Sequence, residues 1–167
     1  MGKEMPITKG DMKIISGGQA GADRAALDFA IAYGIAHGGW CPKGRMAEDG
    51  PVAARYQLME TPTDDPIQRT EWNVRDSEAT VILSIAPQLS GGSRKTAELA
   101  AKYQKPWLHL SREVERTGAS TKLDEFLLKH RPNILNVAGP RRSEEPDVGA
   151  FVLEVLEGVW TKCLKNQ

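Results

Sequence analysis

The run Ala79–Ala86, with the sequence ATVILSIA, constrains the fold of this chain more than any other segment. It is almost entirely apolar and rich in β-branched residues, and neither Gly nor Pro interrupts it. A strand without a polar face must be covered on both sides, which is the usual situation in parallel sheets flanked by helices. We therefore predict that residues 79–86 form the central strand of a parallel sheet.

Segments with helical periodicity alternate with further short apolar segments. A helix is predicted after Gly21, where Ala26, Phe29 and Tyr33 recur at helical spacing, ending near Gly34. Another begins at Asp65-Pro66, with Gln68 to complete a capping box. Strands or extended pieces are also expected at 12–16, 37–41, 56–61, 105–110 and 134–138, and helices at 94–103, 123–131 and 148–159.

This alternation of strands and helices defines the expected fold class. It predicts an α/β protein with a Rossmann-like, doubly wound, mainly parallel sheet and helices on both faces. Residues 1–11 show no period and are expected to form a flexible N-terminal leader. Residues 12–167 are expected to form a single ligand-binding domain, a size typical of one domain.

Charge and composition exclude several classes of function. The 22 Lys and Arg residues balance the 22 Asp and Glu residues, so no net positive field attracts nucleic acid or an anionic membrane. No apolar stretch approaches the roughly 20 residues that cross a bilayer. Cys41 and Cys163 are far apart, and no clustered His, Asp or Glu pattern indicates a metal. We expect a cytoplasmic protein without a metal site that binds neither nucleic acid nor membrane.

The first predicted strand ends in a glycine-rich turn, SGGQAGADRAALDFA, which begins at Ser16. Glycines allow the backbone to turn tightly and to approach an anion, and the following helix presents its positive end. The turn matches neither the GxGxxG pattern of dinucleotide sites nor the P-loop. An ordinary strand–helix turn is the alternative to an anion site. The candidate binding residues here are Gly17, Gly18, Gly21, Ala22 and Asp23.

Two more glycine turns follow predicted strands. SGGSRKTAELA, from Ser90, places Arg94 and Lys95 at a helix start, where the macrodipole disfavours cations unless an anion is bound. Solvated surface cations are the alternative. NVAGPRRSEE, from Asn136, offers arginines suited to phosphate. The candidate binding residues in these two turns are Gly91, Gly92, Ser93, Arg94, Lys95, Thr96, Gly139 and Arg141.

Two further clusters carry candidate ligand contacts. Lys43 follows the second strand in the segment WCPKGR and is available to an anion. Trp72, Asn73 and Arg75 lie in a polar run on a predicted helix, where Trp72 is a candidate to stack on a ring beside Asn73. Core packing is the alternative role for Trp72. Since strands of an open α/β sheet bind ligands at their carboxyl ends, these clusters and turns are expected to meet in one pocket, occupied by a phosphate-bearing small molecule, phosphate or sulfate.

Several of these segments, taken in order, resemble one protein family. SGGQAGADRAALDFA, GGWCPKGRMAEDG, RTEWNVRDSEATVIL, SGGSRKTAELA and KPWLHL together resemble the molybdenum cofactor carrier proteins. That family belongs to a Rossmann-like superfamily that includes the Lonely Guy-type phosphoribohydrolases, formerly labelled lysine decarboxylases. The resemblance extends from Met12 to about Val159. It implies a homo-oligomer, tetramer or dimer, that stores and protects molybdenum cofactor, a phosphate-bearing pterin, without converting it, and that hands it to a molybdoenzyme.

The resemblance also implies an enzymatic alternative. The phosphoribohydrolases carry GGxGTxxE with a catalytic Glu, and aligning its glycines on Gly91 and Gly92 places Glu98 at the catalytic position. Arg94-Lys95 replaces the Gly-Thr pair of that motif, which disfavours the close approach of a nucleotide phosphate. The alternative is therefore a nucleotide N-glycosidase that uses Glu98, with Arg75 orienting the phosphate. A nucleotide-sensing module is a third hypothesis.

Overall fold

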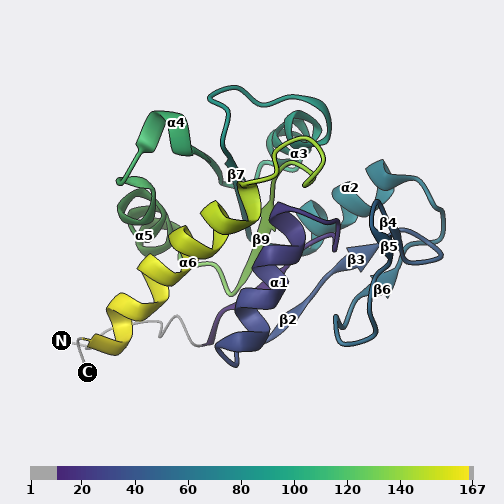
Figure 1. Ribbon diagram of the computed structural model, residues 1–167, viewed down its shortest axis with the longest axis horizontal. Helices are drawn as coiled ribbons and strands as arrows, with labels where there is room; N and C mark the ends of the chain where they lie inside the picture. Colours follow the sequence, from purple (N-terminus) through teal and green to yellow (C-terminus); the bar gives the residue numbers. More distant parts are fainter. Residues whose placement is uncertain (1–10, 166–167) are drawn as a thin grey trace.

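A five-stranded parallel sheet forms the centre of the molecule in the computed structural model, which describes residues 11–165 (Figure 1). Of the expected leader at residues 1–11, residues 1–10 lie outside the described residues. The sheet order is β2-β1-β9-β7-β8, and every pairing is parallel, which confirms the predicted fold class. The strands are β1 Lys13–Ile15, β2 His37–Gly38, β7 Ala79–Ser84, β8 Trp107–Ser111 and β9 Ile134–Ala138.

The strand β7 is buried along its whole length, as its composition predicted, but it is not the central strand. β9, the last strand in the chain, lies in the middle and separates β1 from β7. The apolar composition of β7 requires cover on both faces, and a strand next to the centre satisfies this requirement as well as the central strand does. The carboxyl ends of β1, β9 and β7 therefore lie side by side in that order.

Helices cover both faces of the sheet. α1 (Ala22–Ala32), α5 (Ala119–His130) and α6 (Val148–Lys165) pack against one face, with α1 and α6 side by side in Figure 1. Their buried side chains, including Phe29, Leu123 and Phe151, form the main core with the sheet. α2 (Pro66–Asp76) and α3 (Gly91–Lys102) pack together through Val74 and Leu99, and α4 (Arg112–Glu115) is a single turn.

The sequence pattern predicts a single strand at 37–41, but the structure has two short strands there. Gly39 has a φ of 126° and divides it into β2 and β3 (Trp40–Cys41), which pairs with β6 (Met59–Glu60) in a separate small sheet. A Cβ at Gly39 would lie 2.2 Å from the carbonyl oxygen of Ser16, so only glycine allows this bend beside β1. β4 (Met46–Ala47) and β5 (Gly50–Pro51) form a hairpin in the following loop.

The predicted start of α2 is confirmed in part. Asp65 caps the helix, because its carboxylate accepts a hydrogen bond from the Ile67 N–H at 2.9 Å, and Pro66 is the first helical residue. The capping box is not completed. The Gln68 side chain instead accepts hydrogen bonds from the N–H (3.0 Å) and hydroxyl (2.7 Å) of Thr63, which fixes the preceding loop.

The helix α3 begins at Gly91, three residues before the start predicted at Arg94. Glycine is a poor helix former, which is why the sequence pattern favoured a loop here. In the first turn, however, backbone N–H groups have no partner within the helix, and glycine is tolerated there. Gly91, Gly92 and Ser93 therefore form the first turn of a helix that points its N-terminus at the carboxyl edge of the sheet.

Candidate functional site

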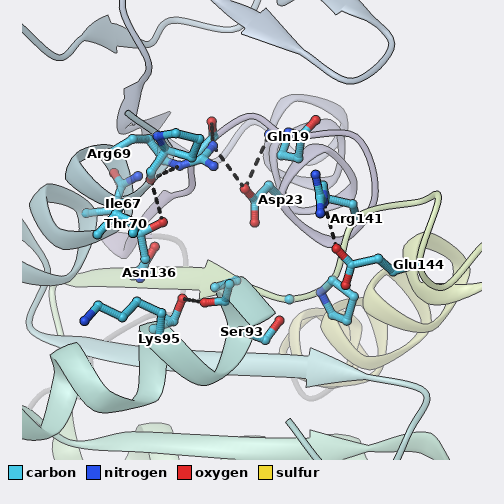
Figure 2. Close-up of a pocket in the computed structure, with 18 residues that line it drawn as sticks. Gln19, Asp23, Ile67, Arg69, Thr70, Ser93, Lys95, Asn136, Arg141 and Glu144 are labelled. Atoms are coloured by element: carbon cyan, nitrogen blue, oxygen red, sulfur yellow. Dashed lines mark hydrogen bonds and ion pairs between the residues drawn. The ribbon is translucent and has the colours of Figure 1, made fainter. Parts of the chain in front are cut away.

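A cavity of about 270 Å³ lies at the carboxyl ends of β1 and β9, between α2 and the first turn of α3 (Figure 2). This is where open α/β sheets bind ligands. Segments far apart in the sequence contribute to its walls. The lining residues are Gly17, Gln19, Asp23, Pro66, Ile67, Arg69, Thr70, Asn73, Gly92, Ser93, Lys95, Thr96, Asn136, Ala138, Gly139, Pro140, Arg141 and Glu144.

The α3 end of the cavity is suited to an anion. Ser90 precedes the helix in an extended conformation, and its side chain makes no capping hydrogen bond. The first-turn N–H groups consequently remain for a ligand, and the helix dipole adds positive potential. Lys95 lies on the same wall, while the Thr96 hydroxyl donates to the carbonyl oxygen of Gly92 at 2.9 Å and holds the turn together.

The opposite end of the cavity carries a buried pair of charges. Arg69 and Asp23 are each 9% exposed, and the Arg69 Nη1 lies 3.9 Å from the Asp23 Oδ2. The Arg69 Nη1 also donates to the carbonyl oxygen of Gly17 at 2.8 Å, and the Asp23 Oδ2 accepts from the Gln19 N–H at 3.3 Å. Burial raises the pKa of Asp23 to about 6, and the nearby guanidinium of Arg69 opposes this shift.

Backbone groups at the start of α1 are hydrogen-bonded to the β9–α6 loop of the same chain. The Ala22 N–H donates to the carbonyl oxygen of Pro140 at 3.2 Å, and the Arg142 N–H donates to the carbonyl oxygen of Ala20 at 2.8 Å. A Cβ at Gly21 would lie 2.6 Å from the Pro140 oxygen, so glycine permits this close contact with the β9–α6 loop. The first glycine turn therefore closes one side of the cavity, and the positive end of α1 is directed to Pro140.

Comparison with known proteins places the chain in a family. Residues 14–160 match the model of the circularly permutated YpsA SLOG family. The chain belongs to this family. A crystal structure of a "putative molybdenum carrier protein" from Syntrophus aciditrophicus SB is 47% identical and superimposes with a TM-score of 0.86, covering 89% of this chain and 94% of that one. No curated protein matches the chain. The resemblance to molybdenum carrier proteins predicted from the sequence is thus confirmed at the level of the family.

About half of the residues predicted from the glycine turns and clusters line the cavity of this family member. The third turn lies between the first two, because β9 separates β1 from β7. The predicted residues brought together in the cavity are Gly17, Asp23, Asn73, Gly92, Ser93, Lys95, Thr96, Gly139 and Arg141. Those that do not line it are Gly18, Gly21, Ala22, Lys43, Trp72, Arg75, Gly91 and Arg94.

The predicted aromatic and arginine contacts of α2 lie in a separate surface cluster. The Trp72 ring meets the Trp40 ring edge-on, with centroids 4.7 Å apart. The Arg75 guanidinium lies 4.3 Å from the Trp72 ring centroid and is hydrogen-bonded to Asp76 at 2.8 Å. Asn73, on the other side of the helix, lines the cavity and also bonds both backbone groups of Trp40.

Glu98 does not line the cavity. Its exposed carboxylate lies 3.5 Å from the Arg94 Nε and 4.0 Å from the Lys95 Nζ, on the outer face of α3. Arg94 therefore pairs with Glu98 and does not line the cavity. Lys43 is exposed in the turn after β3.

Sequence reasoning missed several residues of the cavity, Arg69 foremost. It stands four positions before Asn73 on α2, so both share the face that the cavity uses, but an arginine in a polar helix gives no sign that it will be buried. Gln19, Asn136 and Pro140 occur within the glycine turns and were detectable from them. The other residues not predicted are Pro66, Ile67, Thr70, Ala138 and Glu144.

The described part of the chain contains neither a metal-binding cluster nor a membrane-spanning helix. Among residues 11–161, whose side chains the structure describes, no group of three or more His, Cys, Asp or Glu residues is arranged to hold a metal ion. None of the described helices is long and apolar enough to cross a membrane.

Proposed function

We propose that this protein binds molybdenum cofactor as cargo, as a carrier or protective store, with the cofactor's phosphate at the N-terminus of α3. The observation that carries the proposal is the uncapped first turn of α3, where Gly92, Ser93 and Lys95 face the cavity. A helix N-terminus with a nearby ammonium group is a recurrent arrangement for binding phosphate. The family relationship and the name of the similar Syntrophus protein support this cargo.

The remaining cavity suits the organic part of such a ligand. Its volume of about 270 Å³ is close to the lower end of ordinary small-molecule sites, roughly 300 Å³. Ile67 and Pro66 supply apolar surface on the α2 wall, and Asn136 and Asn73 supply polar groups. Arg141 lies at the rim, where its Nε is held by Glu144 at 2.7 Å. A compact ring system with a phosphate arm fits this distribution of groups.

The enzymatic alternative has no supporting observation at Glu98. Cleavage of a glycosidic bond requires a carboxylate beside the sugar, whereas Glu98 does not line the cavity and its carboxylate lies 3.5 Å from the Arg94 Nε and 4.0 Å from the Lys95 Nζ. Arg75, the proposed phosphate orienter, is engaged with Trp72 and Asp76. A homo-oligomeric state, a cytoplasmic location and delivery to a molybdoenzyme stay predictions from the resemblance.

Native mass spectrometry tests the proposal directly. Protein purified anaerobically from a molybdenum-replete host is expected to carry a mass increment equal to the cofactor, and protein from a host unable to make the cofactor is expected to lack it. The variant Lys95→Glu is expected to lose the increment, because it places a negative charge on the wall that receives the phosphate.

Arg94→Glu is the matched control. It makes the same charge change on the adjacent residue, whose side chain points away from the cavity toward Glu98. It is expected to retain the cofactor. Wild-type protein that never carries the cofactor, or equal retention by the two variants, would contradict the proposal.

A further inference from the structure

The Asp23–Arg69 pair stands at the end of the cavity away from α3, and it differs in character from the phosphate end. The two opposite charges lie 3.9 Å apart and largely cancel, so this end does not attract a net charge. Both residues are 9% exposed, and both line the cavity. Figure 2 shows Asp23 and Arg69 on one side of the opening and Ser93 and Lys95 on the other, with Asn136 between them.

Each member of the pair keeps hydrogen-bonding capacity for a ligand. The Asp23 Oδ2 is used by the Gln19 N–H and faces Arg69, while the other carboxylate oxygen points into the cavity in Figure 2. Arg69 is held through Nε, which donates to the Pro66 oxygen at 3.4 Å, and Nη1, which donates to the Gly17 oxygen. Within the described residues these bonds leave Nη2 available. The pair therefore offers an acceptor beside a donor.

We infer that Asp23 and Arg69 bind the polar edge of a heterocycle in which two neighbouring N–H donors stand beside a carbonyl group, the pattern of a 2-amino-4-oxopyrimidine ring. The inference rests on the proposed function, since it assigns the ring end of the same ligand. The Asp23 carboxylate oxygen that points into the cavity has two lone pairs and can accept from two adjacent N–H groups, and the Arg69 guanidinium donates to the carbonyl. A neutral ring satisfies a pair that is itself neutral.

The same pair discriminates against rings with a different edge. Adenine presents a ring-nitrogen acceptor where the 2-amino-4-oxopyrimidine ring presents an N–H donor, so it would face the Asp23 carboxylate with a lone pair. A ring without the amino group makes one hydrogen bond fewer to the carboxylate. Sites built to hydrogen-bond a ligand reject analogues that leave buried groups unpaired.

Purine nucleotides separate the ring edge from the phosphate, because GMP, IMP and AMP share the same sugar and phosphate. GMP carries the full 2-amino-oxo edge, IMP lacks the amino group, and AMP has the reversed pattern. In calorimetric titrations near pH 7.5, where Asp23 is ionised, wild-type protein is expected to bind GMP at least about tenfold more tightly than AMP, with IMP in between.

The variant Asp23→Asn is expected to abolish most of the preference for GMP, because it weakens GMP binding and no longer sets a carboxylate against the ring-nitrogen lone pair of AMP. Asparagine keeps the shape of the side chain and can still accept from the Gln19 N–H, so the turn is preserved. Asp28→Asn is the matched control on the same helix, because Asp28 is exposed on α1 and accepts from the Tyr56 hydroxyl outside the cavity. It is expected to keep the wild-type preference.

The outcomes separate this inference from the function on which it rests. Equal affinity of wild type for GMP and AMP, or no binding of GMP at millimolar concentration, would overturn the assignment of the ring edge. So would a GMP preference that survives in Asp23→Asn. Cofactor retention with discrimination by Lys95→Glu would still support the carrier function in each of these cases. Absence of cofactor retention together with a strong, Asp23-dependent GMP preference would instead overturn the carrier function and keep the ring edge.

Discussion

Among the residues that line the cavity, Asp23 is the one whose pKa folding shifts most. Its pKa is about 6 rather than the ordinary 3.8, because burial disfavours the charged carboxylate more than Arg69 and Arg24 favour it. The folded protein therefore holds the Asp23 proton over a range of pH in which the unfolded chain has already released it. Across that range the folded state binds more protons, so the contribution of this residue to stability falls as pH rises.

The pH dependence of unfolding gives the first prediction at this scale. Between about pH 4 and pH 6.5, Asp23 is expected to remove about 3 kcal/mol from the free energy of unfolding as pH rises, since each pKa unit corresponds to about 1.4 kcal/mol. Asp23→Asn removes this group from the titration. Urea unfolding of both proteins across the range is expected to show a stability difference that changes steadily in favour of the variant as pH increases. Parallel pH profiles for the two proteins would contradict the assigned burial of the carboxylate.

Two glycines that line the cavity differ in how closely the neighbouring elements pack against them. Gly139 directly follows β9 and lies beside β7, where a Cβ would lie 2.2 Å from the Leu83 carbonyl oxygen and 2.6 Å from the Ala22 Cβ. Neither neighbour is a flexible side-chain tip, so the sheet and α1 must shift to admit a methyl group. Gly92, in the first turn of α3, would place a Cβ with nothing within 4 Å, and its φ is not positive.

Alanine substitution of these two glycines is therefore expected to change stability with opposite sign. Gly139→Ala is expected to lower the free energy of unfolding by about 1–3 kcal/mol through overpacking. Gly92→Ala is expected to raise it by roughly 0.5–1 kcal/mol, because alanine restricts the unfolded chain and fits a helix. Urea denaturation monitored by circular dichroism measures both. Similar losses in the two variants would show that the first turn of α3 is packed rather than open to the cavity.

The sequence predicted elements where the deciding interactions are local. The apolar run of β7 and the Asp65-Pro66 start of α2 depend on neighbouring residues, and both were predicted. The division of β2 from β3 at Gly39 was not, because the bend is required by the Ser16 backbone on another strand. The central place of β9 was missed for the same reason, since strand order depends on how whole elements pack. Arg69 is buried only because Gly17 leaves room for its side chain, with a hypothetical Cβ 2.5 Å from the Arg69 Cδ.

At the scale of the whole molecule, loops from distant parts of the sequence are tied to one another around the cavity. The Glu48 carboxylate accepts from the N–H (3.0 Å) and hydroxyl (2.5 Å) of Ser143, which joins the β4–β5 hairpin to the β9–α6 loop. Asp49 lies 3.0 Å from the Arg24 Nη1 on α1. These contacts connect the walls of the cavity to the main core, so occupancy of the site is coupled to the stability of the entire fold.

Thermal unfolding with and without molybdenum cofactor tests this coupling. A ligand that binds only the folded state at about 100 times its Kd adds about 2.7 kcal/mol. For a chain of 167 residues this corresponds to a rise in Tm of about 5–10 °C. Hydrogen exchange is expected to slow at the start of α1, in α2, in the first turn of α3 and after β9, because all four line the cavity. Lys95→Glu is expected to show neither effect. Protection confined to α3 would mean that the ligand binds the helix end alone and that the Asp23–Arg69 end takes no part in binding.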